Sequence, residues 1–234
     1  MYAYLCRMHV TYIEPFGIHI TEPFTWLTNW TVAGFSMFFG HKLFHHPTSD
    51  IQRKYWSIFF LFMGIASLTG GTAHGFIVYV GNNFHLAAWI LTGFAVFGAE
   101  MASIPLVPQL RLQSILKLLA YMELFVMAAS VLLYKSFDSV QINSAFGMVG
   151  IVAPIQLWKY KADKSIRNAI ILAGIISNIV PAIIHAARFS YNRWFNFNDL
   201  SHVVMIGCFY LIYRGVRTSD LPLSSVVKPT RPSN

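Results

Sequence analysis

Charge is what this sequence has least of. Asp, Glu, Lys and Arg together make up 11% of its 234 residues, whereas soluble domains carry about a quarter. Hydrophobic residues make up 56%, and the apolar runs leave no stretch long enough for a separate soluble domain. Cysteine is also scarce, with Cys6 and Cys208 the only two, which excludes a disulfide framework or a CxxC metal site. The composition therefore indicates an integral membrane protein.

Several functional motifs are absent as well. There is no GxSxG elbow, no P-loop and no GxGxxG after a strand, so soluble hydrolases and nucleotide-binding enzymes lack support. No cleavable signal peptide is expected, because Arg7, Glu14 and Pro15 interrupt the N-terminal segment. The last apolar segment has no lysine to anchor a retinal Schiff base. The net charge is +8, but the basic residues lie between apolar segments, so we expect no nucleic-acid partner.

Seven apolar segments are long enough to cross a bilayer, which takes about 20 residues of helix. They lie near residues 26–44, 56–80, 84–107, 112–134, 139–158, 166–187 and 200–216. The sequence thus predicts an all-α integral membrane protein, a seven-transmembrane-helix bundle over residues 26–217. Residues 1–25 are expected to lie at the outer interface, because Pro15 and Pro23 prevent a long helix there. Residues 218–234 are expected to form a disordered cytoplasmic tail.

The basic residues set the expected orientation, because cytoplasmic loops carry the excess of Lys and Arg. With the N-terminus outside, only Arg7, Lys135, Arg188 and Arg193 of the 17 basic residues fall on the outer side, and the other thirteen fall on the inner side. We therefore expect an outer N-terminus and a cytoplasmic C-terminus. Such a multi-pass protein suits a bacterial inner membrane or a eukaryotic endomembrane.

Polar residues inside the segments gather at one depth, near the outer surface. This layer holds His74, His85, His185, Asn198, Asp199 and His202, from the second, third, sixth and seventh segments. Ionisable groups inside a bilayer are costly and point to function. Imidazoles from several helices suit zinc, copper, iron or nickel, so the layer predicts a metal site. The alternative is that each histidine reaches the interface or hydrogen-bonds to the backbone.

Two carboxyl groups, Glu100 and Glu123, lie deeper and towards the cytoplasm, on the third and fourth segments. They are candidates for a proton relay, or for ordinary hydrogen bonding to Ser, Tyr or backbone groups. On the second segment, Ser67 lies two turns from His74 on the same face. Glycines between the two would let a neighbouring helix or a ligand approach closely.

Helix count, orientation and three short stretches resemble the CREST superfamily of seven-helix membrane proteins. That superfamily includes alkaline ceramidases, adiponectin-receptor-like proteins and SID-type proteins associated with RNA transport. Residues 64–74 resemble its second-helix motif, which ends in a histidine, with Ser67 displaced and a glycine in the usual serine position. Residues 197–202 resemble the seventh-helix HDxxH motif, with Asn198 in place of the first histidine. His85 stands where an aspartate is expected, and residues 20–29 resemble the ceramidase stretch that leads into the first helix.

The resemblance implies a zinc-dependent hydrolase that acts on a lipid amide or ester reaching the site from the bilayer. The candidate metal ligands are His74, His202 and either His85 or His185, and the catalytic candidates are Asp199, Ser67 and Asn198. Bound zinc lowers the pKa of its water to about 7. Asp199 would orient a ligand histidine or act as the general base. Ser67 or Asn198 would stabilise the oxyanion.

A second hypothesis is a non-enzymatic seven-helix protein: a receptor, a lipid- or metal-binding module, or a subunit of a larger membrane complex. The departures from the family pattern at His85 and Asn198 favour it. A third hypothesis is a transporter in which Glu100 and Glu123 move protons. It ranks lowest because no internal repeat is evident, and such repeats are common in transporters. In every case the expected partners are membrane lipids and other membrane proteins.

Overall fold

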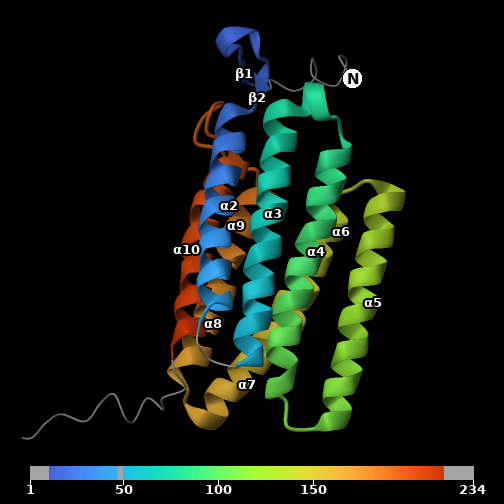
Figure 1. Cartoon of the computed structure of the whole chain (residues 1–234), viewed down its shortest axis with the longest axis vertical. Helices are drawn as coiled ribbons and strands as arrows, with labels where there is room; N and C mark the ends of the chain where they lie inside the picture. Colours follow the sequence, from blue (N-terminus) through green and yellow to red (C-terminus); the bar gives the residue numbers. More distant parts are fainter. Residues whose placement is uncertain (1–10, 47–49, 219–234) are drawn as a thin grey trace, which may run out of the picture.

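The computed structural model describes residues 11–46 and 50–218. These residues form an all-helical bundle with one short β-hairpin at its end (Figure 1). The hairpin consists of β1 (Tyr12–Ile13), the 3-10 turn η1 (Pro15–Gly17) and β2 (Ile20–Thr21), and its strands pair antiparallel. Cys6 and, apart from its first residue, the expected tail lie outside the described residues.

Seven helical segments follow the hairpin. They are α2 (Pro23–Phe44), α3 (Ile51–Val80), α4 (Asn83–Ser103) continued by η2 (Ile104–Leu106), α5 (Leu110–Tyr134), α6 (Asp138–Ser144) continued by the π-helical η3 (Ala145–Val152) and α7 (Ala153–Asp163), α8 (Ile166–Ser177) continued by α9 (Ile179–Ala186), and α10 (Phe197–Arg217). Helices α8 and α9 are separated at Asn178, three residues before Pro181. Proline has no N–H with which to continue the backbone hydrogen bonds of a helix.

The segments expected from the sequence are confirmed as helices. The largest differences are that α3 begins at residue 51 instead of 56, and that α7 ends at residue 163 instead of 158. The earlier start of α3 has a local cause: the side chain of Asp50 accepts a hydrogen bond from the Gln52 N–H at 2.9 Å and caps the helix. α7 is extended by an ion pair between Lys159 and Asp163, one turn apart.

Five of these segments are long and apolar enough to cross a membrane: Ile51–Val80, Asn83–Leu106, Leu110–Tyr134, Asp138–Asp163 and Ile166–Ala186. α2 and α10 are not among them. α2 contains three Thr, two Gly and two Trp residues and ends near His41 and Lys42, and α10 opens with polar residues and closes with Arg214 and Arg217. Both helices are nevertheless central to the bundle, since α2 packs against α3 and α10.

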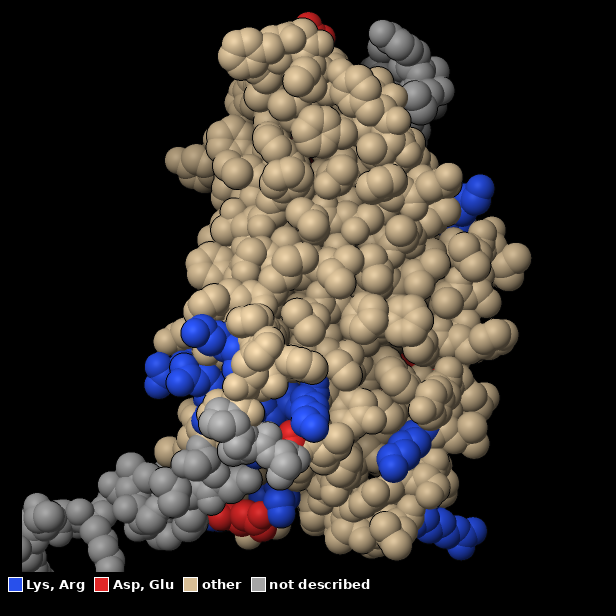
Figure 2. Space-filling view, in the orientation of Figure 1, with Lys and Arg blue, Asp and Glu red and all other residues tan. Residues whose placement is uncertain are grey.

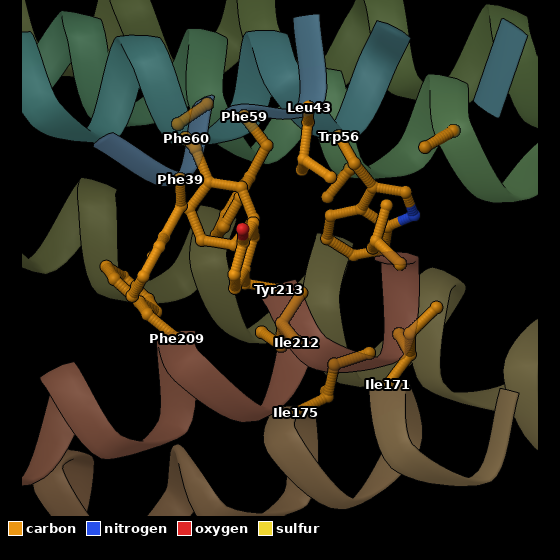
Figure 3. Packing of buried hydrophobic residues seen from close by; sticks show 14 of the residues in the cluster. Phe39, Leu43, Trp56, Phe59, Phe60, Ile171, Ile175, Phe209, Ile212 and Tyr213 are labelled. Atoms are coloured by element: carbon orange, nitrogen blue, oxygen red, sulfur yellow. The ribbon is translucent and has the colours of Figure 1, made fainter. Parts of the chain in front are cut away.

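An aromatic core joins α2, α3 and α10. The ring of Phe39 stacks on that of Tyr213 with centroids 4.5 Å apart, and Phe60 meets Phe39 edge to face at 5.6 Å. Figure 3 shows these rings together, with Ile171 and Ile175 of α8 completing the cluster from the other side. Edge-to-face and stacked pairs add to the free energy gained by burial alone. This core fixes the relative positions of the first, second and last helices.

Glycines allow the helices to approach closely. A Cβ atom at Gly71 of α3 would lie 2.7 Å from Trp30 and 2.8 Å from Asn29, both on α2. A Cβ at Gly98 of α4 would lie 2.9 Å from the backbone nitrogen of Phe59 on α3. The expectation that glycine would permit close approach near His74 is therefore confirmed for Gly71.

The two ends of the bundle differ in charge. Figure 2 shows most of the Lys and Arg residues on this face at the end opposite the hairpin, whereas the middle of the face is almost free of charged residues. We call the two ends the hairpin end and the basic end. At the basic end Arg167 of α8 donates to Asp50 at 2.9 Å, and Arg53 of α3 donates to the Val216 carbonyl of α10. Residues 11–22, expected at an outer interface, form the hairpin that gives the other end its name.

Candidate functional site

The four histidines singled out from the sequence all lie at the hairpin end. His74 is near the end of α3 and His85 is in the first turn of α4, which follows directly. His185 is in the last turn of α9, and His202 is in the second turn of α10. Each side chain keeps some accessible surface. The predicted layer is therefore present in space as well as in sequence.

His74 is paired with a carboxylate that precedes the first long helix. Its Nδ1 lies 2.6 Å from Oε2 of Glu22. Glu22 adopts a left-handed backbone conformation (φ 43°, ψ 57°), and its N–H donates to the carbonyl of Thr11 at 2.8 Å. A residue other than glycine is strained in that conformation. This strained residue lies where the chain turns from the hairpin into α2, next to His74.

The electrostatics of Glu22 follow from this pair. Burial acts to raise the pKa of Glu22, but the hydrogen bond and charge of His74, together with the charge of His85, outweigh burial and hold the pKa below its ordinary value of 4.5. Glu22 is therefore a carboxylate near neutral pH. An imidazole that donates Nδ1–H to a carboxylate presents Nε2 as its remaining acceptor atom.

The hairpin also holds the backbone next to His74. The hydroxyl of Thr21 donates to the carbonyl of His74 and lies 3.2 Å from that of Gly75. Immediately beyond, Phe76 departs from helical geometry (φ −122°, ψ 26°). A kink exposes carbonyls that the helix can no longer satisfy, and Thr21 satisfies them. The hairpin thus positions both the side chain and the backbone of His74.

His202 is the centre of a second set of hydrogen bonds. Its Nδ1 lies 3.1 Å from Oγ1 of Thr28 on α2, and the same hydroxyl lies 3.4 Å from Oδ1 of Asp199. A hydroxyl has one hydrogen to donate. When Thr28 donates to Asp199 it accepts from His202, so the His202 ring carries its hydrogen on Nδ1. Nε2 is then a free acceptor, as in His74.

Asp199 has a structural task as well. Its Oδ2 accepts from the N–H of Asn196 at 2.7 Å, and the Asn196 side chain accepts from the N–H of Asn198 at 2.7 Å. This is a capping box at the start of α10. Asp199 is fully buried, and both of its oxygens accept hydrogen bonds from the protein. The geometry favours a residue that orients Thr28 and His202 over a general base that meets a substrate.

His85 and His185 flank these two groups. The His85 ring lies edge to face against His74, with centroids 4.8 Å apart. The His185 ring lies between those of Phe137 and Phe197, with centroids 5.5 and 5.1 Å away. The fourth histidine is thus part of the set, although its immediate neighbours are aromatic.

The side chains form one electrostatic unit, which we call the histidine cluster: Glu22, Thr28, His74, His85, His185, Asp199 and His202. The charge of His74 acts on His85, His185 and His202. Ser67, predicted to stabilise an oxyanion, is buried two turns below His74 in α3. No hydrogen bond joins Ser67 to the cluster among the described residues.

The chemistry of these donors suits zinc, but their arrangement does not. Among residues 11–46 and 50–218, no group of three His, Cys, Asp or Glu side chains stands close enough to hold one metal ion. The Nδ1 atoms of His74 and His202 already contact Glu22 and Thr28. Zinc needs three protein ligands at about 2 Å. As the side chains stand, they do not fit the ion that the resemblance implies.

What the cluster presents is two imidazole rings that are held through Nδ1 and whose Nε2 atoms have no hydrogen-bond partner among the described residues. Nε2 of His74 and of His202 can each accept a hydrogen bond or a proton, and each ring is held through Nδ1 by an oxygen atom from the N-terminal part of the chain. Rings oriented in this way suit the binding of hydroxyl or amide hydrogens. Sequence reasoning missed Glu22 and Thr28 as site residues. The only local signal was an acidic residue directly before Pro23, the first residue of α2.

Comparison with known proteins gives one match. Residues 24–220 match a family described as a family of unknown function (DUF6962). No curated protein and no solved structure matches the chain. The match begins one residue into α2 and ends just beyond α10, so it spans the whole helical bundle.

Proposed function

The chain belongs to this family of unknown function, and we propose that it is a multi-pass membrane protein that binds a lipid through the histidine cluster. The observation that carries the proposal is the cluster itself: histidines of four helices, with two carboxyl groups beside them, lie at one end of the bundle. Polar groups at membrane depth are retained for function, because they are costly there.

The proposal includes seven spans with the hairpin end outside. Five segments meet the criteria of length and hydropathy. α2 and α10 have 22 and 21 residues, and at 1.5 Å per residue each is just over about 30 Å long, the thickness of the hydrocarbon core. The gathering of Lys and Arg at the basic end supports a cytoplasmic basic end (Figure 2).

The ligand class follows from the acceptors and from a neighbouring groove. A shallow groove of about 480 Å³, lined by Thr31, Gly34, Phe35 and Phe38, runs along the exposed side of α2. Thr31 is one turn from Thr28, which contacts His202. An acyl chain in the groove would bring a lipid head to Nε2 of His202. A lipid head group with hydroxyl or amide hydrogens can donate hydrogen bonds to the Nε2 atoms of His74 and His202.

A metal-dependent lipid hydrolase is the second candidate function. It is favoured by the resemblance to the CREST superfamily and by the way both Nδ1 atoms are held, which is how proteins orient metal-binding imidazoles. It requires side chains of the cluster to move, since the described residues assemble no ligand set. Hydrolysis of a lipid amide or ester would then be added to the binding proposed above.

The topology is tested by cysteine labelling. In a background without Cys6 and Cys208, a cysteine placed at Asn83 between α3 and α4 should react with an impermeant reagent added to intact cells. A cysteine placed at Ala162, near the end of α7, should react only after the cells are opened. Both positions are exposed, so accessibility differs only through the membrane. Labelling at Ala162 from outside would overturn the orientation.

The binding is tested by native mass spectrometry of the delipidated protein with ceramide or phosphatidylcholine. Ceramide carries amide and hydroxyl hydrogens, and the phosphatidylcholine head carries none. We expect ceramide to bind more tightly, and His202→Ala to abolish the difference. Gly34→Leu should block the groove, whereas Gly207→Leu is its matched control, since both are helical glycines with open space around them. Equal binding of both lipids by wild type would overturn the proposal.

The same experiment separates the second candidate. Zinc content is measured on the purified protein, and the lipid is analysed after incubation with added zinc. Release of a fatty acid from ceramide that is lost in His74→Ala and His202→Ala would support the hydrolase. Ceramide that stays intact on a protein that takes up no zinc would leave lipid binding alone.

A further inference from the structure

A second polar site lies inside the bundle, away from the histidine cluster. Glu100 of α4 is 1% exposed, and Glu123 of α5 is partly buried. Their carboxyl groups lie within hydrogen-bonding reach of each other. We call them the carboxyl pair. Asn143 of α6, 4% exposed, donates from its amide to Oε1 of Glu123. Three helices thus contribute to one buried polar cluster.

The π-helix η3 brings the backbone against both carboxyls. A Cβ atom at Gly147 would lie 3.2 Å from Oε1 of Glu100 and 3.3 Å from Oε1 of Glu123. A larger residue would meet Val96 at 2.4 Å, so only glycine allows this approach. π-helical turns are rare and are found mostly at functional sites.

The cluster has fewer donors than acceptors. Oε1 of Glu100, Oε2 of Glu123 and Oδ1 of Asn143 are buried and have no hydrogen-bond partner among the described residues. Glu123 receives a hydrogen bond from Asn143. For Glu100, the described part of the chain provides only Glu123 within reach. An unpaired buried acceptor is costly, and two adjacent carboxylates would also repel each other.

Within residues 11–46 and 50–218, no further titrating group acts on Glu100 or Glu123. Tyr55 of α3 packs against the apolar residues around Met101, and Tyr121 of α5 packs on Phe97 with ring centroids 5.0 Å apart. On α7, Lys159 pairs with Asp163. Gln156, also on α7, is neutral, and its side chain donates a hydrogen bond to the hydroxyl of Ser103 at 3.0 Å.

We propose that the carboxyl pair is a proton-binding site within the bundle, with the proton carried by Glu100 and donated to Glu123. One proton removes the repulsion between two carboxylates and provides the hydrogen that the cluster lacks. Glu123 is the anion of the pair, because it accepts a hydrogen bond from the Asn143 amide.

Infrared spectroscopy of the purified wild-type protein in detergent tests the site directly. A protonated carboxyl has a carbonyl band that a carboxylate lacks, and the band shifts in D2O. We expect this band at neutral pH with the intensity of one buried carboxyl, and its loss in Glu100→Gln. Glu123→Gln should keep the band, since Glu100 can still donate its proton to the amide oxygen. Asp199→Asn controls for the other buried carboxyl of the bundle.

Three outcomes would overturn the proposal. The first is a wild-type spectrum with no such band. The second is a band that is lost in Asp199→Asn and kept in Glu100→Gln. The third is a band that appears only after washing with a chelator or a sodium-free buffer, which would mean that a metal cation occupies the pair instead of a proton. The wild-type measurement needs no variant to fold, and lipid binding by the histidine cluster is a separate readout.

Discussion

The carboxyl groups of the histidine cluster and those of the carboxyl pair differ in the hydrogen-bond donors that the protein gives them. At the hairpin end every carboxylate has donors from the protein: Glu22 has the ring of His74, and Asp199 has the Asn196 N–H and the Thr28 hydroxyl. Between α4 and α5, Glu100 and Glu123 have fewer donors than they need. Groups that are fully partnered are fixed in place, whereas groups that lack a donor depend on something from outside. The comparison assigns orientation to the first site and exchange to the second.

The helices that carry the histidine cluster are also more tightly packed than α5, which carries one residue of the carboxyl pair. α2, α3 and α10 share an aromatic core and close glycine contacts. α5 contributes only Ala120, Met127 and Val131 as buried residues. The histidine cluster is therefore built on the most tightly packed helices, and one half of the carboxyl pair is on the least covered one. Movement of α5 costs less contact than movement of α2.

Replacing Gly71 should have the largest effect, because it breaks the packing that carries the histidine cluster. In Gly71→Leu the new side chain meets Trp30, Asn29 and the Trp26 backbone, and overpacking of this kind costs about 3 kcal/mol. Thermal unfolding in detergent measures the loss. Gly207→Leu is the control, since a Cβ there meets nothing within 4 Å. Equal melting temperatures for the two variants would contradict the close approach of α2 and α3.

Glu22→Gln should come next, because it removes a charged partner from His74. Hydrogen bonds to charged groups contribute about 2 kcal/mol. The folded pKa of Glu22 lies below 4.5, so its stabilisation is present above pH 4.5 and is lost as the pH falls through the folded pKa. Wild type should therefore lose more stability than Glu22→Gln between pH 6 and pH 3.

Glu14 provides a matched control for this prediction. It pairs with His19 at 2.9 Å in the same N-terminal segment, but its side chain is 60% exposed. Exposed ion pairs contribute little, so Glu14→Gln should follow the wild-type pH profile. A profile of Glu22→Gln that also follows wild type would mean that the His74 pair does not form in solution.

Asp199→Asn should have a smaller effect, of about 1 kcal/mol, as expected for loss of a helix cap. Asn196→Ala should cost a similar amount because both residues belong to one capping box. The double variant should lose less than the sum of the two, since each single change already breaks the box. Strict additivity, measured by unfolding of the three variants, would show that Asp199 acts through Thr28 and His202 and not through the cap.

Glu100→Gln should change stability least, by less than about 0.5 kcal/mol, the range of substitutions that remove no specific interaction. The new amide supplies the hydrogen that Glu123 now takes from Glu100. Glu100→Met removes it and should destabilise the protein by about 2 kcal/mol through the unpaired Glu123. If Gln and Met are equally harmful, the missing donor is not the feature that governs the carboxyl pair.

The sequence was sufficient for the helices and for the depth of their polar residues. Runs of apolar residues set each segment, and His74, His85, His185 and His202 met at one end because alternate helices reverse direction. The spans themselves, their orientation and the bound metal stay predictions. A hydrophobic run predicts where a helix lies, but it does not predict which atoms of the polar residues in that helix form hydrogen bonds with other segments.

What the sequence missed depends on contacts between distant segments. Glu22 meets His74 only because a hairpin returns the chain to the end of α3, and Thr28 meets His202 across most of the chain. Asp199, a catalytic candidate from its place in a stretch that resembles HDxxH, is also the N3 residue of a capping box, which depends on the backbone geometry at the start of α10. The π-helix η3 lies in an apolar run, and nothing in that run distinguishes it from an α-helix. A wider helical turn does not require different side chains.

The low hydropathy of α2 also bears on how the protein is made. Among the described helices α2 is synthesised before the others, yet one of the helices that it packs against, α10, is synthesised after them. Thr28 of α2 cannot contact His202, and Phe39 cannot contact Tyr213, until α10 has been translated. In a growing chain α2 has only α3 to shield its polar face. Glycine-mediated pairing of α2 with α3 is thus the contact available to α2 during synthesis, and packing of α10 completes both the aromatic core and the histidine cluster.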